Sequence, residues 1–225
     1  AESKAEMLPL LPAEGMAVLP ADDFFFPLLT SLSPCPVLAF GFGESALVRC
    51  LEVQAESLTS IRAKIRLADE TVELTLPLPG RHNLANALAA AAGALALGCA
   101  TADIIQGLES YAGLAMRGQV VALPGGATLI NDAYNANPSS VAAALQVLRA
   151  ATGRKLFVFG TMLELGECGP EAHRRVGEQA AAAGVSILVT VGDLGALAAE
   201  TARAAGVETL TAETPEEAAD LLRPL

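Results

Sequence analysis

The chain has 225 residues, 52% of them hydrophobic and 17% charged, which provides for a sizeable core and excludes the disordered class. Fourteen Lys and Arg against twenty-five Asp and Glu give a net charge of −11, which repels nucleic-acid backbones and anionic membrane surfaces, so we expect neither as a partner. With 4% aromatic residues and no Trp, the core is built from Ala, Leu and Val, a composition that favours an α/β protein.

The four cysteines, Cys35, Cys50, Cys99 and Cys168, lie far apart and form no CxxC pair, which indicates neither a zinc site nor a disulfide framework. No uninterrupted apolar run reaches the roughly 18 residues of a spanning helix, and the first residues lack a signal-peptide pattern. We therefore expect reduced thiols, no membrane insertion and a cytoplasmic location.

The first half of the chain is predicted to contain several strands. Residues 1–11 are expected to be helical. Strands are then predicted at residues 16–19, 37–40, 46–53, 60–67 and 71–76. In the last two, apolar residues alternate with charged ones, the period of two that is typical of a half-exposed antiparallel hairpin, with Asp69-Glu70 as its turn.

Two helices are predicted next. The longer one begins at an N-cap, either His82 or Asn83, and ends at Gly98. The second begins at Thr101, its predicted N-cap, and extends to residue 111.

Beyond residue 113, predicted strands alternate with predicted helices. The strands are 120–123, 128–131, 155–159, 186–191 and 208–210, and the helices are 139–151, 170–183, 194–205 and 215–222. Such alternation predicts right-handed βαβ units on a mainly parallel sheet. We place a domain boundary near Ala115.

The first polar cluster opens the longer helix and reads GRHNLANALAA. It contains Asn83 and Asn86. An Asn amide offers both a donor and an acceptor, which suits the edge of an adenine. Asn is also a common helix N-cap that requires no ligand, and on spacing alone the cap is the simpler interpretation.

The second polar cluster, NDAYNANP, lies between a strand and a helix whose N-cap is Asn137 or Ser139, with Pro138 in the first turn. Ligands of parallel α/β sheets gather at the carboxyl ends of strands, so this position suits a binding site. The same residue types are ordinary turn formers, so a plain loop is the alternative.

The third polar cluster, GTMLELGE, also follows a strand, and His173 lies in the next helix. Glu164 and Glu167 have the chemistry to coordinate a cation or to accept hydrogen bonds from an amine. Alternatively, they are carboxylates stabilised by the dipole at the start of a helix.

In order and spacing, these clusters and the junction Met116-Arg117-Gly118 resemble the peptidoglycan Mur ligases over essentially the whole chain. The NDAYNANP form matches those members that add D-alanyl-D-alanine. The resemblance implies an α/β fold in which residues 1–114 are the later part of an ATPase-like central domain. Residues 115–225 are then a Rossmann-like C-terminal domain, incomplete at its end.

The resemblance also implies an ATP-dependent amide ligase of peptidoglycan precursor synthesis. ATP phosphorylates the terminal carboxylate of a UDP-N-acetylmuramoyl tripeptide, and the amine of D-alanyl-D-alanine attacks the acyl phosphate. Asn83 and Asn86 are then expected to hold adenine and Asp132 the ribose hydroxyls. The resemblance also implies that Arg117 is a catalytic residue that reaches the transferred phosphate. The residues implied to bind the peptide ends are Tyr134, Asn135 and Asn137.

Lys4 resembles a lysine of the family that is carbamylated and helps to hold Mg²⁺, which makes Mg²⁺ the second implied cofactor. A carbamate turns the cation into an anion and so reverses its value near a divalent metal. We expect Lys4 to be unmodified in this chain and to act in catalysis and metal binding only in the full-length enzyme.

The sequence contains no GxxxxGK[ST] phosphate loop, whereas the family carries a related loop near the start of its central domain. We therefore expect an inactive fragment whose missing N-terminal part belongs to the same enzyme. Two alternatives stay open. One is a sister ligase of the Mur and folylpolyglutamate type that adds another amino acid, and the other is a noncatalytic nucleotide-binding module.

Overall fold

The computed structural model describes residues 5–223 and divides the chain into two compact units, Ala1–Gly113 and Leu114–Leu225. Each unit combines a β-sheet with helices, which confirms the α/β class. Lys4 lies outside the described residues. Within residues 5–223, no helix has the length and apolar character needed to cross a membrane.

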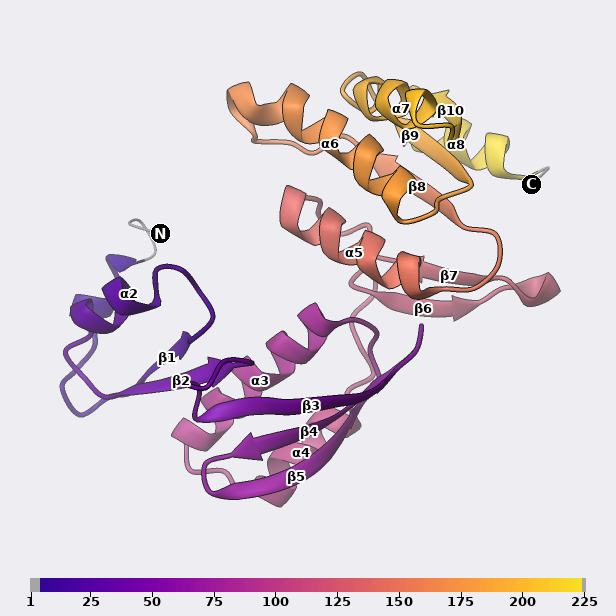
Figure 1. Ribbon diagram of the computed structural model, residues 1–225. Coiled ribbons are helices and arrows are strands. Elements are labelled where there is room, and N and C mark those ends of the chain that lie inside the picture. Colours follow the sequence, from indigo (N-terminus) through magenta and orange to yellow (C-terminus); the bar gives the residue numbers. More distant parts are fainter. Residues whose placement is uncertain (1–4, 224–225) are drawn as a thin grey trace. The chain divides into compact units, whose positions relative to one another are not determined.

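The first unit contains a five-stranded sheet in the order β1-β2-β3-β4-β5 (Figure 1). The strands are Ala17–Pro20 (β1), Val37–Gly41 (β2), Val48–Glu56 (β3), Ile61–Leu67 (β4) and Glu70–Leu76 (β5). β1, β2 and β3 are parallel neighbours, and β3, β4 and β5 pair antiparallel, so the predicted hairpin is confirmed. Its turn is Ala68-Asp69, one residue earlier than predicted, because Glu70 already pairs with Leu67.

Helices Arg81–Ala96 (α3) and Thr101–Glu109 (α4) cover one face of this sheet (Figure 1). The period of two along β4 explains the packing, since Ile61, Ala63 and Ile65 are fully buried while Arg62 and Lys64 are exposed. The buried face of β4 shares one hydrophobic core with apolar residues of both helices. Burial of this face fixes the register, because a slip by one residue would turn the charges inward.

The predicted caps of these two helices are wrong. Gly80 is the N-cap of α3, with φ of 89°, so His82 and Asn83 lie inside the first turn. Glycine adopts this backbone conformation without a steric penalty, and the helix therefore begins before the asparagine. Similarly, Ala100 is the N-cap of α4, and Thr101 is its first residue. The predicted end of α3 is confirmed, because Gly98 follows its C-cap with φ of 82°.

Two further helical segments differ from expectation. Within the described part of residues 1–11, a short 3-10 helix, Leu8–Leu10 (η1), replaces the continuous predicted helix. Pro9 lacks an N–H group, which prevents an α-helix from continuing through it. Phe26–Leu32 (α2) was not predicted; it is short, none of its residues is fully buried, and only Phe26 and Leu29 pack partly against a small core.

The second unit has a three-stranded parallel sheet in the order β10-β9-β8 and a separate hairpin of β6 and β7. The strands are Gln119–Ala122 (β6), Thr128–Asn131 (β7), Leu156–Gly160 (β8), Ile187–Val191 (β9) and Glu208–Ala212 (β10). The parallel sheet was predicted, but β6 and β7 pair antiparallel. Residues 123–127 between them are too few for a parallel crossover, and they include the 3-10 helix Pro124–Gly126 (η2).

Four helices accompany these strands: Pro138–Ala150 (α5), Gly169–Ala182 (α6), Gly195–Ala204 (α7) and Pro215–Leu222 (α8). β9 packs on both faces, as expected for a central parallel strand. Leu188 belongs to a core with α5, α6 and α7, whereas Ile187 and Val189 pack with α8. The carboxyl ends of β7 and β8 lead directly into the second and third polar clusters.

Candidate functional site

The first polar cluster forms the first turns of α3. Asn83 is half-buried, and its Nδ2 donates a hydrogen bond of 2.7 Å to the carbonyl oxygen of Pro79. This bond uses one of the two amide hydrogens and fixes the orientation of the side chain. Asn86 follows three residues later on the same side of the helix and is exposed. The first unit therefore presents one anchored and one exposed amide at this helix start.

In the second polar cluster, the two later asparagines have local partners. Asn137 caps α5, because its Oδ1 accepts hydrogen bonds from the N–H groups of Ser139 (3.0 Å) and Ser140 (2.9 Å). The Ser140 hydroxyl accepts in turn from the Asn137 N–H at 3.0 Å, which completes a capping box. Asn135 Oδ1 accepts from the N–H of Ala136 at 2.8 Å. The predicted cap at Asn137 is thus confirmed.

The first half of the same cluster is joined to the residues around Arg117. Asp132 Oδ1 accepts from the N–H of Gly118 at 3.0 Å, and the Tyr134 N–H donates to the carbonyl oxygen of Met116 at 3.1 Å. The guanidinium carbon of Arg117 lies 3.9 Å from the centroid of the Tyr134 ring, a cation–π contact. Three residues to which sequence reasoning gave separate roles, Arg117, Asp132 and Tyr134, are therefore in one place.

A buried histidine in the following helix holds the backbone of the third polar cluster. His173 in α6 is fully buried, and its Nε2 accepts from the N–H of Met162 at 3.0 Å. A backbone N–H can only donate, so Nδ1 carries the proton and donates to the carbonyl oxygen of Gly169 at 2.7 Å. Both ring nitrogens are used, and the imidazole packs beside Phe159. This histidine therefore supports the loop and is not available to a ligand.

The two carboxylates of the third cluster point to no metal site. Glu164 is exposed with φ of 63°, and Glu167 is exposed within the 3-10 helix Gly166–Cys168 (η3), just before α6. Across residues 5–223, no three His, Cys, Asp or Glu side chains gather in a way that would hold a metal ion. The position of Glu167 agrees with a carboxylate stabilised at the start of a helix.

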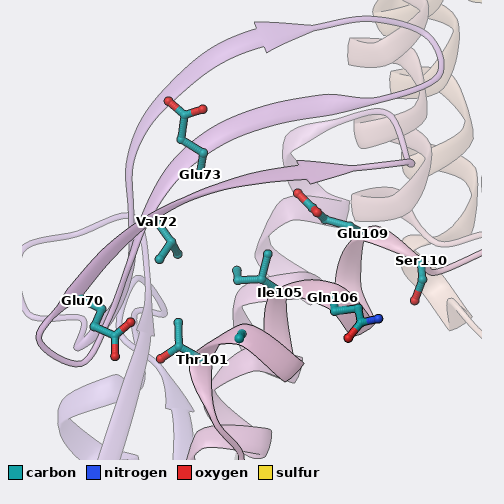
Figure 2. A pocket seen from close by; sticks show the side chains of 9 residues that line it. Glu70, Val72, Glu73, Thr101, Ile105, Gln106, Glu109 and Ser110 are labelled. Atoms are coloured by element: carbon teal, nitrogen blue, oxygen red, sulfur yellow. The ribbon is translucent and has the colours of Figure 1, made fainter.

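The open groove of the first unit lies elsewhere, between β5 and α4 (Figure 2). Figure 2 shows Val72 and Ile105 facing each other across it, while Glu73 points away. Glu109, one of the residues that line the groove, already has a hydrogen-bond partner, because its Oε1 accepts from the N–H of Thr75 at 2.9 Å. None of the predicted site residues in the described chain lines this groove.

Comparison with known domain families assigns both units. Residues 1–94 match the family described as Mur ligase middle domain, and residues 116–225 match the Mur ligase, glutamate ligase domain. The chain belongs to the Mur ligase family. The unmatched residues 95–115 include α4 and the segment that leads to Arg117.

Individual Mur ligases are similar to large parts of the chain. The UDP-N-acetylmuramoyl-tripeptide–D-alanyl-D-alanine ligase of Escherichia coli (strain K12) is 35% identical over 194 residues, which cover 85% of this chain and 43% of the relative. The UDP-N-acetylmuramate–L-alanine ligase of Stenotrophomonas maltophilia is 38% identical over 159 residues, 68% of this chain and 33% of that protein. The crystal structure of MurF from Acinetobacter baumannii gives a TM-score of 0.87 at 30% identity, covering 98% of this chain and 47% of that one. The chain thus spans less than half the length of these relatives.

Proposed function

We propose that the protein carrying this chain is an ATP-dependent ligase that joins D-alanyl-D-alanine to a UDP-N-acetylmuramoyl tripeptide during peptidoglycan precursor synthesis. One observation carries the proposal. The NDAYNANP loop, the form that resembles the D-alanyl-D-alanine-adding members, is joined directly to Arg117 in the matched ligase domain. The similarity to the E. coli ligase of that name supports it.

We assign ATP to four residues, each considered within its own unit. Asn83 and Asn86 offer amide groups for adenine at the start of α3. Asp132 is exposed and uses Oδ1 for Gly118, so Oδ2 is positioned to accept from a ribose hydroxyl. Arg117 supplies positive charge for the transferred phosphate. For Mg²⁺, the described residues contain no ligand cluster, and the ligand that the resemblance implies, Lys4, lies outside them.

The reaction proceeds in two steps. A carboxylate oxygen of the tripeptide attacks the terminal phosphorus of ATP, and ADP leaves. The amine of D-alanyl-D-alanine then attacks the acyl carbon, loses a proton, and displaces inorganic phosphate. Arg117 offers five N–H donors to the phosphate oxygens throughout, and we assign the dipeptide to Asn135 and Asn137 of the same loop. The nucleotide-linked substrate and the unpaired cysteines are in keeping with a cytoplasmic location.

The test is the amine dependence of ADP formation in the complete protein that contains these residues. We expect ADP to form with UDP-N-acetylmuramoyl tripeptide and D-alanyl-D-alanine, and not when L-alanine or D-glutamate replaces the dipeptide. The similarity to the L-alanine ligase of S. maltophilia favours one second candidate. ADP formation with UDP-N-acetylmuramate and L-alanine, without a response to the dipeptide, would establish that candidate instead.

A further inference from the structure

The turn around Arg117 and the loop that begins at Asp132 are fastened together at three points. The Asp132 carboxylate holds the N–H of Gly118, the Met116 carbonyl holds the N–H of Tyr134, and the Tyr134 ring lies against the Arg117 guanidinium. The contacts involve the residue before the arginine, the arginine itself and the residue after it. Together they fix both the backbone and the side chain of Arg117.

The backbone of this turn requires such support. Met116 has φ of 62° and Gly118 has φ of 69°, so the residues on both sides of Arg117 adopt the left-handed conformation. A non-glycine residue reaches that region only at a cost in free energy. Arg117 adds a backbone bond of its own, from its N–H to the carbonyl oxygen of Leu114 at 3.2 Å. The bonds to Met116 and Gly118 offset the cost and select one turn geometry.

We propose that Tyr134 and Asp132 are positioning residues that present Arg117 to the transferred phosphate. The inference rests on the proposed function, since it takes Arg117 as the residue that meets phosphate. A free arginine side chain has many rotamers, and docking on the ring removes this freedom before the substrate arrives. Asp132 acts through Gly118 and fixes the backbone from which the side chain extends.

Stacking leaves the arginine competent to bind anions. The guanidinium donors lie in the plane of the group, and the tyrosine ring contacts its face. The two interactions therefore use different parts of the same group and are compatible. Tyr134 is 62% exposed and Arg117 is exposed, so the donor edges are not enclosed by neighbouring side chains.

The docking itself is testable in this chain by NMR. A ring 3.9 Å from the guanidinium shifts the Arg117 Hδ and Hε resonances upfield through its ring current. We expect this shift in the parent and in Tyr134→Phe, which keeps the ring, and its loss in Tyr134→Leu. Tyr111→Phe, at the other tyrosine of the chain, is the matched control and leaves the shift unchanged. Arg117 resonances that do not respond to Tyr134→Leu would overturn the proposal.

The catalytic consequence is a split between kinetic constants in the complete ligase. Tyr134→Leu is expected to lower kcat about tenfold with little change in the KM of D-alanyl-D-alanine, because a misaligned arginine slows the phosphate chemistry. Tyr134→Phe should restore the parent kcat. A raised KM for the dipeptide at unchanged kcat would mean that Tyr134 binds the peptide, and it would overturn the positioning role. If the parent protein forms no ADP with the dipeptide, the proposed function fails, and the NMR result still decides whether Tyr134 holds Arg117.

Discussion

The loops that follow β7 and β8 are both rich in polar residues, but they are held in opposite ways. The loop after β8 is held by the buried side chain of His173, which forms hydrogen bonds to the backbone through both ring nitrogens. The loop after β7 is held by contacts of its own exposed side chains, those of Asp132, Tyr134 and Asn137. A polar motif at a strand end therefore does not by itself define a binding site. The accessible side chains of the loop after β7 are the reason why we assign the substrates to that loop and not to the loop after β8.

The largest effect is expected at the buried histidine. His173→Ala removes the acceptor of the Met162 N–H and the donor to the Gly169 carbonyl, and it leaves a cavity beside Phe159. We expect a loss of about 3 kcal/mol or more in the free energy of unfolding. Chemical denaturation monitored by circular dichroism measures it, with the exposed neighbour substitution Arg174→Ala as control. Equal stability of the two variants would remove the contrast between the loops.

A smaller effect is expected at the cap of α5. Asn137→Ala loses the two bonds that Oδ1 accepts from the first turn but keeps the backbone N–H that donates to Ser140, so we expect a destabilisation of about 1 kcal/mol. Asn135→Ala is the matched control, because the Asn135 side chain accepts only from the N–H of the next residue, Ala136, and caps no helix. The same denaturation experiment compares them. A loss at Asn137 as large as that at His173 would show that the exposed loop is not held weakly.

The smallest effect on stability is expected at Asp132. The Asp132 side chain is exposed and its bond to Gly118 is only partly buried, so Asp132→Ala should cost at most about 1 kcal/mol in unfolding free energy. In the complete ligase, the same substitution should raise the KM for ATP about tenfold or more, because a charge-assisted hydrogen bond to ribose is lost. Asp193→Ala, at the end of β9, is the control for an exposed strand-end aspartate. A variant that melts far below the parent with unaltered kinetics would make Asp132 a structural residue only.

Local patterns in the sequence predicted the fold wherever burial follows a simple period. The β4–β5 hairpin was predicted because each second residue along β4 is buried. The short α2 was missed because none of its residues is fully buried, and the antiparallel pairing of β6 with β7 was not predicted because alternation of elements does not specify strand direction. The N-cap of α3 was misplaced because the sequence does not show that Gly80 adopts a positive φ and so begins the helix before His82 and Asn83.

The sequence predicted which side chains belong to the candidate site, but it did not predict how these side chains contact one another. The cap at Asn137 followed from local spacing, because its partners lie two and three residues away. The bond between Asp132 and Gly118 joins residues that are 14 apart, and it uses a backbone group that no motif displays. Likewise, the sequence placed His173 near the third cluster, but its two bonds depend on how α6 packs against the end of β8.

We propose that the amides of α3 and the loop after β7 bind the substrates, and that the loop after β8 does not. NMR of the labelled chain tests this most directly, through amide shifts on addition of millimolar ADP and, separately, millimolar D-alanyl-D-alanine. We predict that ADP shifts the resonances of Asn83, Asn86 and Asp132, that the dipeptide shifts those of Asn135 and Asn137, and that Met162 and His173 respond to neither. Shifts concentrated at Met162 and His173, with the loop after β7 unchanged, would show that the ligands bind at the loop after β8 instead.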